Sequence, residues 1–473
     1  MSQDSNEPEL QPTIFVIFGI TGDLAQRYLL PALYHLFKDG KLHDQTEIVG
    51  ITRRDITAED LLKQTELCVN EIDKVCDPEA LAAMHRHTRM VQMDLNDADA
   101  YAKLLQTLNG IEDETGVCMN RLYYLSIPPQ VYAPVIQHLG NQGLSGSCQH
   151  GQASSRLLIE KPFGYDLQSA RDLVQETGSV FDESQIFRID HFLAKETAQN
   201  ILTFRFKNPI FEPLWNAEHI ASIDIATSEQ IGIEGRVQFY EPLGALRDFI
   251  QNHLLQLLAI TTMDQPAALD SDSIHRSKQY LLEQIQPVPA DKVADNAHRG
   301  QYKGYREEVN NPDSATETYA DITIFIDSER WRNVPMRLWT GKNLHEKNYD
   351  ITVNFRSQAD EPGNRLIFHI QPNEGIELDL LAKKPGFDDK LQTAAMDFSY
   401  QQNFDDHGHP NAYERVLVDA VKGDHTLFTT SEEVLASWRV VQPILDEWSK
   451  NSSDLMMYEP GSSGPLDVES SGF

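Results

Sequence analysis

Apolar runs alternate with helical segments along the first two hundred residues of the chain. A wholly apolar run at residues 14–18 is followed by further strand-like runs at residues 47–51, 90–94, 121–126, 156–159 and 185–189. Short runs of this kind predict strands buried on both faces of a parallel sheet. Helical periodicity occurs between them at residues 29–36, 61–84 and 170–181. We therefore expect an α/β domain in which helices connect the strands.

The pattern changes after residue 198. The later strand-like segments are longer and alternate between apolar and polar residues, at residues 219–228, 320–327, 335–340 and 349–355. Alternation predicts strands with one buried face, which usually pair in antiparallel sheets. The chain is thus expected to divide into an α/β domain at residues 12–198 and a larger α+β domain at residues 199–473, built on a mostly antiparallel sheet.

Two further segments of the second half differ from these strands. Residues 244–263 have the apolar spacing of a buried amphipathic helix. The tail from residue 451 is rich in Ser, Gly and Asp and is expected to be loose.

A glycine turn follows the first predicted strand and leads directly into the first predicted helix. It comprises Gly19, Thr21, Gly22, Asp23 and Leu24. Glycines in this place let the backbone approach a pyrophosphate at a helix N-terminus, as in a Rossmann-like dinucleotide-binding domain. The spacing is G-x-x-G instead of the full G-x-G-x-x-G, and a glycine turn after a strand can also be only a turn.

Two arginines, Arg53 and Arg54, follow the second predicted strand. An NAD enzyme typically presents Asp or Glu here to the ribose hydroxyls, whereas an arginine suits the 2′-phosphate of NADP through its charge and its bidentate fork. The pair therefore favours NADP. Two solvated arginines are the alternative, which the preceding glycine turn weakens.

Glu160, Lys161 and Pro162 follow a later strand, at the edge where open α/β sheets bind ligands. Lys161 can reach both a coenzyme and a substrate from this place, and the Lys161–Pro162 bond is a candidate for the cis form.

Residues 188–196 concentrate five charged or titratable side chains in nine positions. One interpretation is a solvated helix start capped by Asp190. The other is an anion site in which His191 and Lys195, four residues apart, share one helical face and bind a phosphate.

Three more candidates lie in the second half of the chain. His253 is at the edge of the apolar stripe of the helix predicted over residues 244–263. A histidine in this position is most often a core residue with satisfied hydrogen bonds. Lys342 and Lys347 lie on a loop between two predicted strands, where solvated lysines are also common.

Composition narrows the function classes. The 473 residues carry a formal net charge of −32, which argues against nonspecific nucleic-acid binding, so an anionic ligand must be held by a local cluster of Lys, Arg and His. The four cysteines at 68, 76, 118 and 148 lack metal-ligand spacing, so we expect free thiols in a reducing compartment and no metal. The polar start has no secretory h-region, and no apolar run is long enough to cross a membrane. We therefore expect a cytoplasmic protein.

Several segments resemble one family in the same order along the chain. Residues 188–196 read Arg-Ile-Asp-His-Phe-Leu-Ala-Lys-Glu and match seven of the nine positions of the Arg-Ile-Asp-His-Tyr-Leu-Gly-Lys-Glu signature of glucose-6-phosphate dehydrogenases. The Gly-x-x-Gly-Asp-Leu-Ala turn, Glu-Lys-Pro, the segment Arg-Asp-x-x-Gln-Asn-His-Leu at residues 247–254 and Gly-Lys-x-Leu-x-x-Lys at residues 341–347 are similar to further segments of this family. The matches reach residue 415 and imply a complete enzyme.

The resemblance implies that D-glucose 6-phosphate is oxidised at C1 to 6-phospho-D-glucono-1,5-lactone with NADP, the first step of the oxidative pentose phosphate pathway. It assigns His253 as the catalytic base and Asp190 as its orienting carboxylate. It assigns the substrate to His191, Lys195, Glu229, Asp248, Lys342, Lys347 and Lys161, and the coenzyme to Gly19, Thr21, Gly22, Asp23, Leu24, Arg53 and Lys161. It also implies a homodimer or homotetramer formed through the sheet of the second domain.

Four residues depart from the family pattern. Phe192 lacks the hydroxyl of the family's tyrosine, so we expect a higher KM for the substrate. Gln26 and Tyr28 replace lysines, which weakens the expected coenzyme contacts, and Ala194 replaces a glycine, which matters only where φ is positive. Two alternatives stay open: another Rossmann-fold oxidoreductase acting on a neutral sugar or polyol, and an NADP-binding homologue without catalytic activity.

Overall fold

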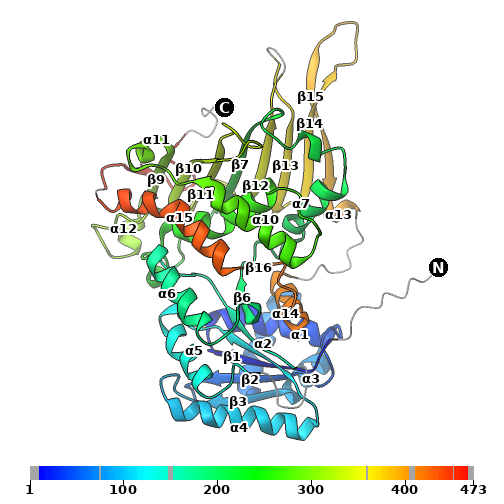
Figure 1. Cartoon of the computed structure of the whole chain (residues 1–473), viewed down its shortest axis with the longest axis vertical. Coiled ribbons are helices and arrows are strands. Elements are labelled where there is room, and N and C mark those ends of the chain that lie inside the picture. Colours follow the sequence, from blue (N-terminus) through cyan, green and yellow to red (C-terminus); the bar gives the residue numbers. More distant parts are fainter. Residues whose placement is uncertain are drawn as a thin grey trace, which may run out of the picture. The chain divides into compact units, whose positions relative to one another are not determined.

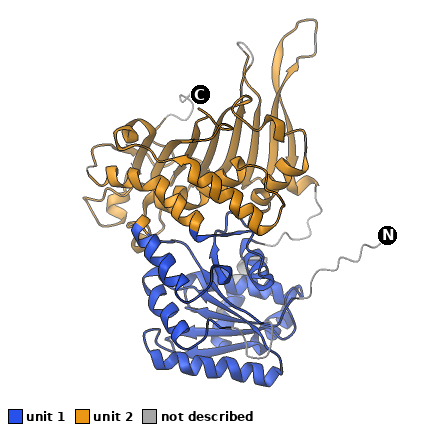
Figure 2. Cartoon of the chain, in the orientation of Figure 1, with its two compact units in different colours: residues 1–164, 168–194, 410–431 blue, residues 165–167, 195–409, 432–473 orange. Residues whose placement is uncertain are grey.

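The protein divides into two compact units, which Figure 2 distinguishes by colour. The computed structural model describes residues 10–73, 76–146, 153–357, 361–403, 411–450 and 452–466. Unit 1 contains Met1–Gly164, Gln168–Ala194 and Pro410–Ser431, and unit 2 contains Tyr165–Leu167, Lys195–His409 and Glu432–Phe473. Residues 410–431 thus belong to unit 1, although they lie far beyond residue 198. The functional domain limits at residues 12–198 and 199–473 stay a prediction.

Unit 1 is built on a seven-stranded sheet with the order β16-β6-β5-β4-β1-β2-β3 (Figure 1). Its strands are β1 Thr13–Phe18, β2 Glu47–Thr52, β3 Thr88–Gln92, β4 Asn120–Leu125, β5 Ser155–Ile159, β6 Ile186–Ile189 and β16 Phe428–Thr429. All neighbours are parallel except β16 and β6. Every residue of β1, β2 and β4 is buried, which is why these strands are mostly apolar. The order reverses at β1, so a ligand is expected at the carboxyl ends of β1 and β4.

Helices connect the strands of unit 1 as the periodicity predicts, with one difference. They are the π-helix η1 Ala25–Leu29, α1 Leu30–Lys38, α2 Ala58–Asp73, α3 Pro78–Arg86, α4 Ala98–Thr115, α5 Tyr132–Asn141 and α6 Leu167–Gly178, with short 3-10 turns η2 Pro129–Val131 and η3 Glu183–Gln185. The helix predicted over residues 61–84 is two helices, α2 and α3. A new N-terminus forms because the Asp77 side chain accepts hydrogen bonds from the amides of Glu79 and Ala80, with Pro78 at the first position.

The return of the chain to unit 1 is made by α14 Ala412–Lys422. This helix contacts α1, η1 and β4. The Arg156 guanidinium, on β5, donates to the carbonyl oxygens of Ala420 at 2.5 Å and Val421 at 2.6 Å and so satisfies carbonyl groups at the end of α14. A helix far along the sequence is thereby fixed beside the glycine turn.

Unit 2 is built on a ten-stranded sheet whose main path is β15-β14-β13-β12-β7-β11-β10-β9-β17, with β8 paired to β10 (Figure 1). Its strands are β7 Ile220–Ser228, β8 Ile285–Gln286, β9 Ala297–Tyr302, β10 Tyr319–Ile326, β11 Met336–Gly341, β12 Asn348–Phe355, β13 Arg365–Gln371, β14 Gly375–Lys383, β15 Leu391–Ser399 and β17 Leu455–Tyr458. The pairs are antiparallel except β11 with β7 and β17 with β9. The mostly antiparallel sheet confirms the expected fold class.

The helices of unit 2 are α7 Glu196–Lys207, α8 Val237–Tyr240, the π-helix η5 Leu246–Leu254, α9 Leu255–Thr262, α10 Ser271–Gln284, α11 Val293–Asn296, α12 Tyr305–Glu308, α13 Tyr400–Asn403 and α15 Ser431–Trp448, with 3-10 turns η4 Glu212–Leu214 and η6 Ala290–Lys292. Helix η5 contacts β11 and β10, and α7 contacts β13. The buried helix predicted over residues 244–263 is η5 followed by α9. All residues of α9 are buried, as expected, but α9 has no exposed polar face.

One prediction about the C-terminal tail and one about the cysteines are wrong. The tail is not loose over residues 455–458, because this segment forms β17 and pairs with β9 along its length. Cys118 is disulfide-bonded, whereas free thiols were expected. Cys76 is a thiol that is not part of a disulfide, and the side chains of Cys68 and Cys148 lie outside the described part. Across the described residues, no helix combines the length and the apolar character needed to cross a membrane.

Candidate active site

The glycine turn after β1 is shaped by a close approach that requires glycine. Gly19 has a φ of 77°, and a Cβ atom on it would lie 2.3 Å from the Ser126 carbonyl oxygen, just after β4. The Gly22 amide donates to the Gly19 carbonyl oxygen at 2.8 Å, and Thr21 Oγ1 lies 3.3 Å from Thr52 Oγ1 at the end of β2. The turn therefore lies where the strand order reverses, which is the pyrophosphate position in this type of sheet.

The helix after the turn carries two of the departures from the family pattern. Asp23 is exposed and pairs with Arg27 at 2.7 Å, near the start of the helix. Gln26 is buried, whereas Tyr28 is half exposed and stacks on Tyr413 of α14 with 5.2 Å between ring centroids. The Tyr28 side chain thus contributes to the packing of α14.

Arg53 and Arg54 lie just beyond β2, with exposed side chains. Their backbone is held, because the Arg54 amide donates to Thr52 Oγ1 at 3.1 Å and Gln92 Nε2 donates to the Arg53 carbonyl oxygen at 3.1 Å. Among the described residues, neither guanidinium has an ion-pair or hydrogen-bond partner. Two free cations at the end of β2 suit a 2′-phosphate.

Glu160 and Lys161 follow β5, and the Lys161–Pro162 peptide bond is cis. The Tyr124 hydroxyl donates to the buried Glu160 carboxyl group. Burial raises the pKa of Glu160 to about 7, while the Tyr124 hydrogen bond and the Lys161 charge lower it and the Asp190 charge raises it. Lys161 and Asp190, two of the predicted site residues, therefore both act on the charge of Glu160.

The segment after β6 does not form the helical face predicted for it. The Asp190 carboxylate accepts a hydrogen bond from the Phe192 amide at 2.9 Å, which closes a turn directly after the strand. Helix α7 begins only at Glu196, with Lys195 as its N-cap residue. His191 and Lys195 consequently do not share a helical face, and they belong to different units.

The solvated helix start is wrong for this segment as well. Arg188 and Asp190 are each 2% exposed. Arg188 pairs with Glu183 at 2.6 Å and donates to Ser431 Oγ at 2.7 Å, so its charge is used inside unit 1. Ala194 is absent from the described non-glycine residues with positive φ, so it replaces the family's glycine without backbone strain.

His253 lies on the π-helix η5, in unit 2. It is 1% exposed, and its ring meets the Phe249 ring edge-on with 5.7 Å between centroids. Its amide donates to Asn252 Oδ1 at 2.6 Å. π-Helical turns are rare and frequently occur at functional sites, which adds weight to a functional role for this histidine.

Lys342 is buried, with 3% of its surface exposed. It is therefore not the solvated lysine that its place on a loop suggested. Its ammonium pairs with the Glu229 carboxylate and lies 3.8 Å from an Asp248 carboxylate oxygen. The same ammonium lies over the rings of Phe249, at 5.4 Å, and Tyr240, at 5.1 Å. Three predicted substrate residues are thus in contact inside unit 2.

Tyr349 at the start of β12 connects the remaining predicted lysines, and sequence reasoning gave it no role. The Lys195 and Lys347 ammonium groups lie over its ring at 4.9 and 5.8 Å from the centroid. Its hydroxyl donates to Glu229 Oε1 at 3.4 Å, and burial and the Glu229 charge raise its pKa far above the ordinary value. Alternation along the strand predicts that Tyr349 is buried but carries no signal for these contacts.

A continuous series of contacts therefore joins the predicted residues of unit 2. The Phe249 ring contacts both His253 and Lys342, and Glu229 contacts both Lys342 and Tyr349. The cluster brings together Lys195, Glu229, Asp248, His253, Lys342 and Lys347. It combines a buried imidazole with three ammonium groups and two carboxylates, a set that can bind a phosphorylated polyol and accept a proton from it.

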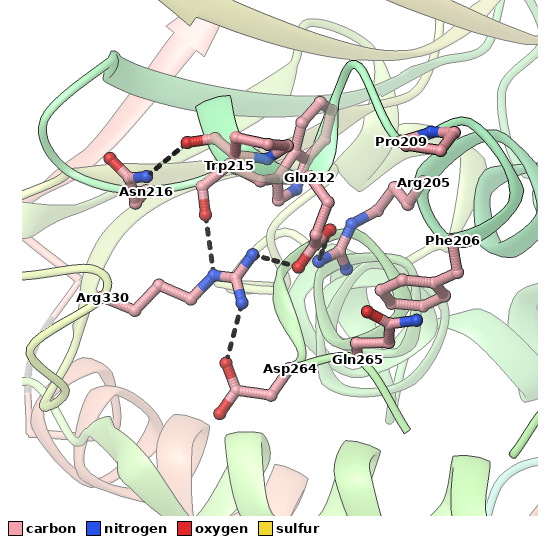
Figure 3. Close-up of a pocket in the computed structure, with 10 residues that line it drawn as sticks. Arg205, Phe206, Pro209, Glu212, Trp215, Asn216, Asp264, Gln265 and Arg330 are labelled. Atoms are coloured by element: carbon pink, nitrogen blue, oxygen red, sulfur yellow. Dashed lines mark hydrogen bonds and ion pairs between the residues drawn. The ribbon is translucent and has the colours of Figure 1, made fainter. Parts of the chain in front are cut away.

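A cavity of about 740 Å³ in unit 2 is lined by none of these residues (Figure 3). Its charged groups are already paired: Glu212 binds both Arg205, at 3.2 Å, and Arg330, and Arg330 also binds Asp264 at 3.0 Å. Because each guanidinium faces a carboxylate, the cavity has little free positive charge for a phosphate. In the described part of the chain, no group of three or more His, Cys, Asp or Glu side chains could hold a metal.

Comparison with known proteins agrees across almost the whole chain. Residues 16–200 match the family model described as glucose-6-phosphate dehydrogenase, NAD binding domain, and residues 202–471 match glucose-6-phosphate dehydrogenase, C-terminal domain. Glucose-6-phosphate 1-dehydrogenase of Chlamydia muridarum is 39% identical over 97% of this chain and 94% of its own length, and that of Bacillus subtilis is 37% identical over 96% of each. A solved glucose-6-phosphate dehydrogenase in complex with its substrate glucose-6-phosphate has a TM-score of 0.90 and 32% identity, covering 98% of this chain and 97% of that one. The chain belongs to the glucose-6-phosphate dehydrogenase family.

Proposed function

We propose that the chain oxidises D-glucose 6-phosphate at C1 to 6-phospho-D-glucono-1,5-lactone with NADP, as an NADP-dependent oxidoreductase. The observation that carries this proposal is the cluster of Lys195, Lys342 and Lys347 beside a buried histidine in unit 2. The chain as a whole has a net charge of −32, so the Lys195 and Lys347 ammonium groups beside one ring mark the place where an anionic sugar binds. Lys342 adjoins them and is paired with Glu229. Membership of the family supports the same reaction.

We assign the roles in unit 2 from the chemistry of the side chains. Lys195 and Lys347 bind the phosphate, because both ammonium groups approach the Tyr349 ring and so bring two positive charges to one place. The Lys195 ammonium also donates to Gln371 Oε1. Lys342 also binds substrate. Glu229 and Asp248 accept hydrogen bonds from sugar hydroxyls. His191 and Lys161 contribute from unit 1, where Lys161 also contacts the coenzyme.

His253 is proposed as the base that takes the proton from the O1 hydroxyl. An imidazole with an ordinary pKa of about 6.5 suits proton transfer near neutral pH. Asp190 is proposed to orient the imidazole and to stabilise the imidazolium as it forms. When bound, NADP supplies the nicotinamide carbon that accepts the hydride from C1. No step of this assignment uses a metal.

Unit 1 fits the coenzyme on two independent grounds. A Cβ atom at Gly19 would collide with the backbone, so the turn keeps open the close approach that a pyrophosphate needs. Arg53, whose guanidinium has no partner in the part of the chain that the structure describes, presents its charge to the 2′-phosphate. Backbone and side-chain groups of the turn complete the proposed site: Gly19, Thr21, Gly22, Asp23 and Leu24.

Three further proposals concern the domains, the oligomeric state and the location of the protein. We propose functional domains at residues 12–198 and 199–473, and a homodimer or homotetramer formed through the sheet of unit 2. We propose the cytoplasm as the location. A disulfide is unusual in a reducing cytoplasm. Titration of the Cys118 thiol in protein from freshly lysed cells therefore tests the proposed location.

The reaction is tested by the rate at which the coenzyme is reduced. Glucose 6-phosphate and glucose are each combined with NADP and with NAD. We expect turnover with glucose 6-phosphate but not with glucose, and a lower KM for NADP than for NAD. Equal turnover of glucose would favour an oxidoreductase for neutral sugars. NADP binding without turnover of any sugar would leave a non-catalytic homologue.

A further inference from the structure

We propose that Tyr458, in strand β17, is a positioning residue for Lys342, and that residues 455–462 hold the loop that carries this lysine. The inference rests on the proposed function, in which Lys342 binds the substrate. Tyr458 is 3% exposed, and β17, which it ends, is paired in parallel with β9.

Hydrogen bonds fix the Lys342 backbone on both sides. The Lys342 amide donates to the Thr318 carbonyl oxygen at 2.9 Å, and the Lys342 carbonyl oxygen accepts from the Tyr458 hydroxyl at 2.7 Å. The Tyr458 hydroxyl also lies 2.8 Å from Thr318 Oγ1 and 3.2 Å from the Thr318 carbonyl oxygen. One hydroxyl group therefore connects the lysine loop, the residue before β10 and strand β17.

The directions of these hydrogen bonds follow from the number of protons. Thr318 Oγ1 accepts from the Tyr302 amide at 2.9 Å, so its own proton is available for the Tyr458 oxygen. Tyr458 has a single proton, which goes to the nearer carbonyl, that of Lys342. The result is a series of hydrogen bonds that runs from Tyr302 through Thr318 and Tyr458 to Lys342. Consecutive hydrogen bonds in a buried setting strengthen one another.

The turn that follows Tyr458 supports the rest of the loop. The Gly461 amide donates to the Asn343 carbonyl oxygen at 2.8 Å, and the His345 amide donates to the Ser462 carbonyl oxygen at 3.0 Å. Asn343 has a φ of 55°, so the loop turns sharply directly after Lys342. A loop in this conformation depends on partners outside itself. The Asn343 and Leu344 amides donate to the Ile231 and Glu229 carbonyl oxygens, each at 2.9 Å, and β17 and the turn after it provide the other partners.

The position of the Lys342 ammonium depends on this backbone. The ammonium lies between the Glu229 carboxylate and the Phe249 ring, so a shift of the loop moves the charge away from both. Loss of the Tyr458 hydroxyl would leave the Lys342 carbonyl without its donor and would let the loop move. The consequence is weaker substrate binding, whereas the coenzyme turn in unit 1 is unaffected.

The test compares single variants of the full chain by steady-state kinetics and thermal unfolding. Tyr458→Phe keeps the buried ring and removes the hydroxyl, so we expect KM for glucose 6-phosphate to rise about tenfold with KM for NADP unchanged. Thr318→Val removes the hydroxyl that donates to the Tyr458 oxygen but leaves the Tyr458–Lys342 hydrogen bond, so KM for glucose 6-phosphate should rise by less than in Tyr458→Phe. Thr318→Ser keeps the hydroxyl and should behave as wild type. Tyr305→Phe is the matched control, because it removes a hydroxyl bonded to Glu241 at 2.6 Å in the same tyrosine cluster.

Each outcome decides the inference. A KM for glucose 6-phosphate within twofold of wild type in Tyr458→Phe overturns it, and so does an equal rise in Tyr305→Phe, which would indicate general loss of packing. Where Tyr458→Phe does not fold, the Thr318→Val and Thr318→Ser pair decides. Absence of glucose 6-phosphate turnover in the wild-type protein overturns the proposed function, and the role of Tyr458 with it.

Discussion

The Lys342 ammonium is paired with the Glu229 carboxylate inside unit 2, although only 3% of Lys342 is exposed. A buried ion pair contributes little net stability, but removal of one partner leaves an uncompensated charge. Lys342→Met should therefore lower the free energy of unfolding by about 3 kcal/mol. Urea denaturation measures this change, and the double variant Glu229→Gln/Lys342→Met should recover part of it. A single variant as stable as wild type would contradict the pairing.

Coenzyme selectivity should depend on Arg53. Its guanidinium is exposed, with no ion-pair partner among the described residues, so Arg53→Ala should not change the thermal midpoint. Loss of a charge-assisted hydrogen bond to the 2′-phosphate should raise KM for NADP by about 10- to 100-fold. NAD lacks this phosphate and is the internal control, so its KM should stay constant. An equal rise in KM for NADP and NAD would mean that Arg53 does not contact the 2′-phosphate.

The Glu160 carboxyl group should keep its proton up to about pH 7 in the folded protein, because burial raises its pKa to about 7 from 4.5. Between these pH values the unfolded chain has lost a proton that the folded chain retains. The contribution of Glu160 to stability is therefore complete below pH 4.5 and is lost as pH rises through about 7, by up to about 3 kcal/mol.

Infrared difference spectra of the carboxyl C=O stretch measure this titration directly. The signal should disappear near pH 7 in wild type and be absent in Glu160→Gln, which keeps an acceptor for the Tyr124 hydroxyl. A titration near pH 4.5 would show that Glu160 is solvated.

Restoration of the family's tyrosine should improve substrate binding. Phe192 is 3% exposed and follows Asp190 and His191 in the turn after β6. A hydroxyl that gains a hydrogen bond to the sugar phosphate contributes about 0.5–1.5 kcal/mol. Phe192→Tyr should therefore lower KM for glucose 6-phosphate by about 2- to 10-fold. Steady-state kinetics of the variant and of wild type measure this KM, together with kcat. A higher KM would mean that the site has no room for the hydroxyl.

The parallel sheet of unit 1 could be predicted because β1, β2, β4 and β6 are buried on both faces and are mostly apolar. The glycine turn could be predicted for a related reason, since Gly19 is the residue that the close approach of Ser126 requires. In unit 2, alternation located β7, β10, β11 and β12 to within about two residues, which is the usual accuracy at element ends.

Other features were predicted wrongly or were missed. The helical face of His191 and Lys195 was wrong because a local hydrogen bond from the Phe192 amide to Asp190 closes a turn. The strand β17 was missed because its Ser- and Gly-rich surroundings indicate a loop, whereas pairing with β9 makes it a strand. The contacts of Tyr349 with two lysines likewise leave no trace in its neighbours along the chain.

The central claim is that this chain oxidises glucose 6-phosphate with NADP, using His253 as the base. The most direct measurement is the initial rate of NADPH formation by wild type and by His253→Asn, with NADP binding measured on both proteins. We predict turnover only with the phosphorylated sugar, and a loss of about 10²- to 10⁴-fold in kcat for the variant at unchanged NADP affinity. A variant with wild-type kcat, or a wild-type protein that binds NADP without turnover, would contradict the account.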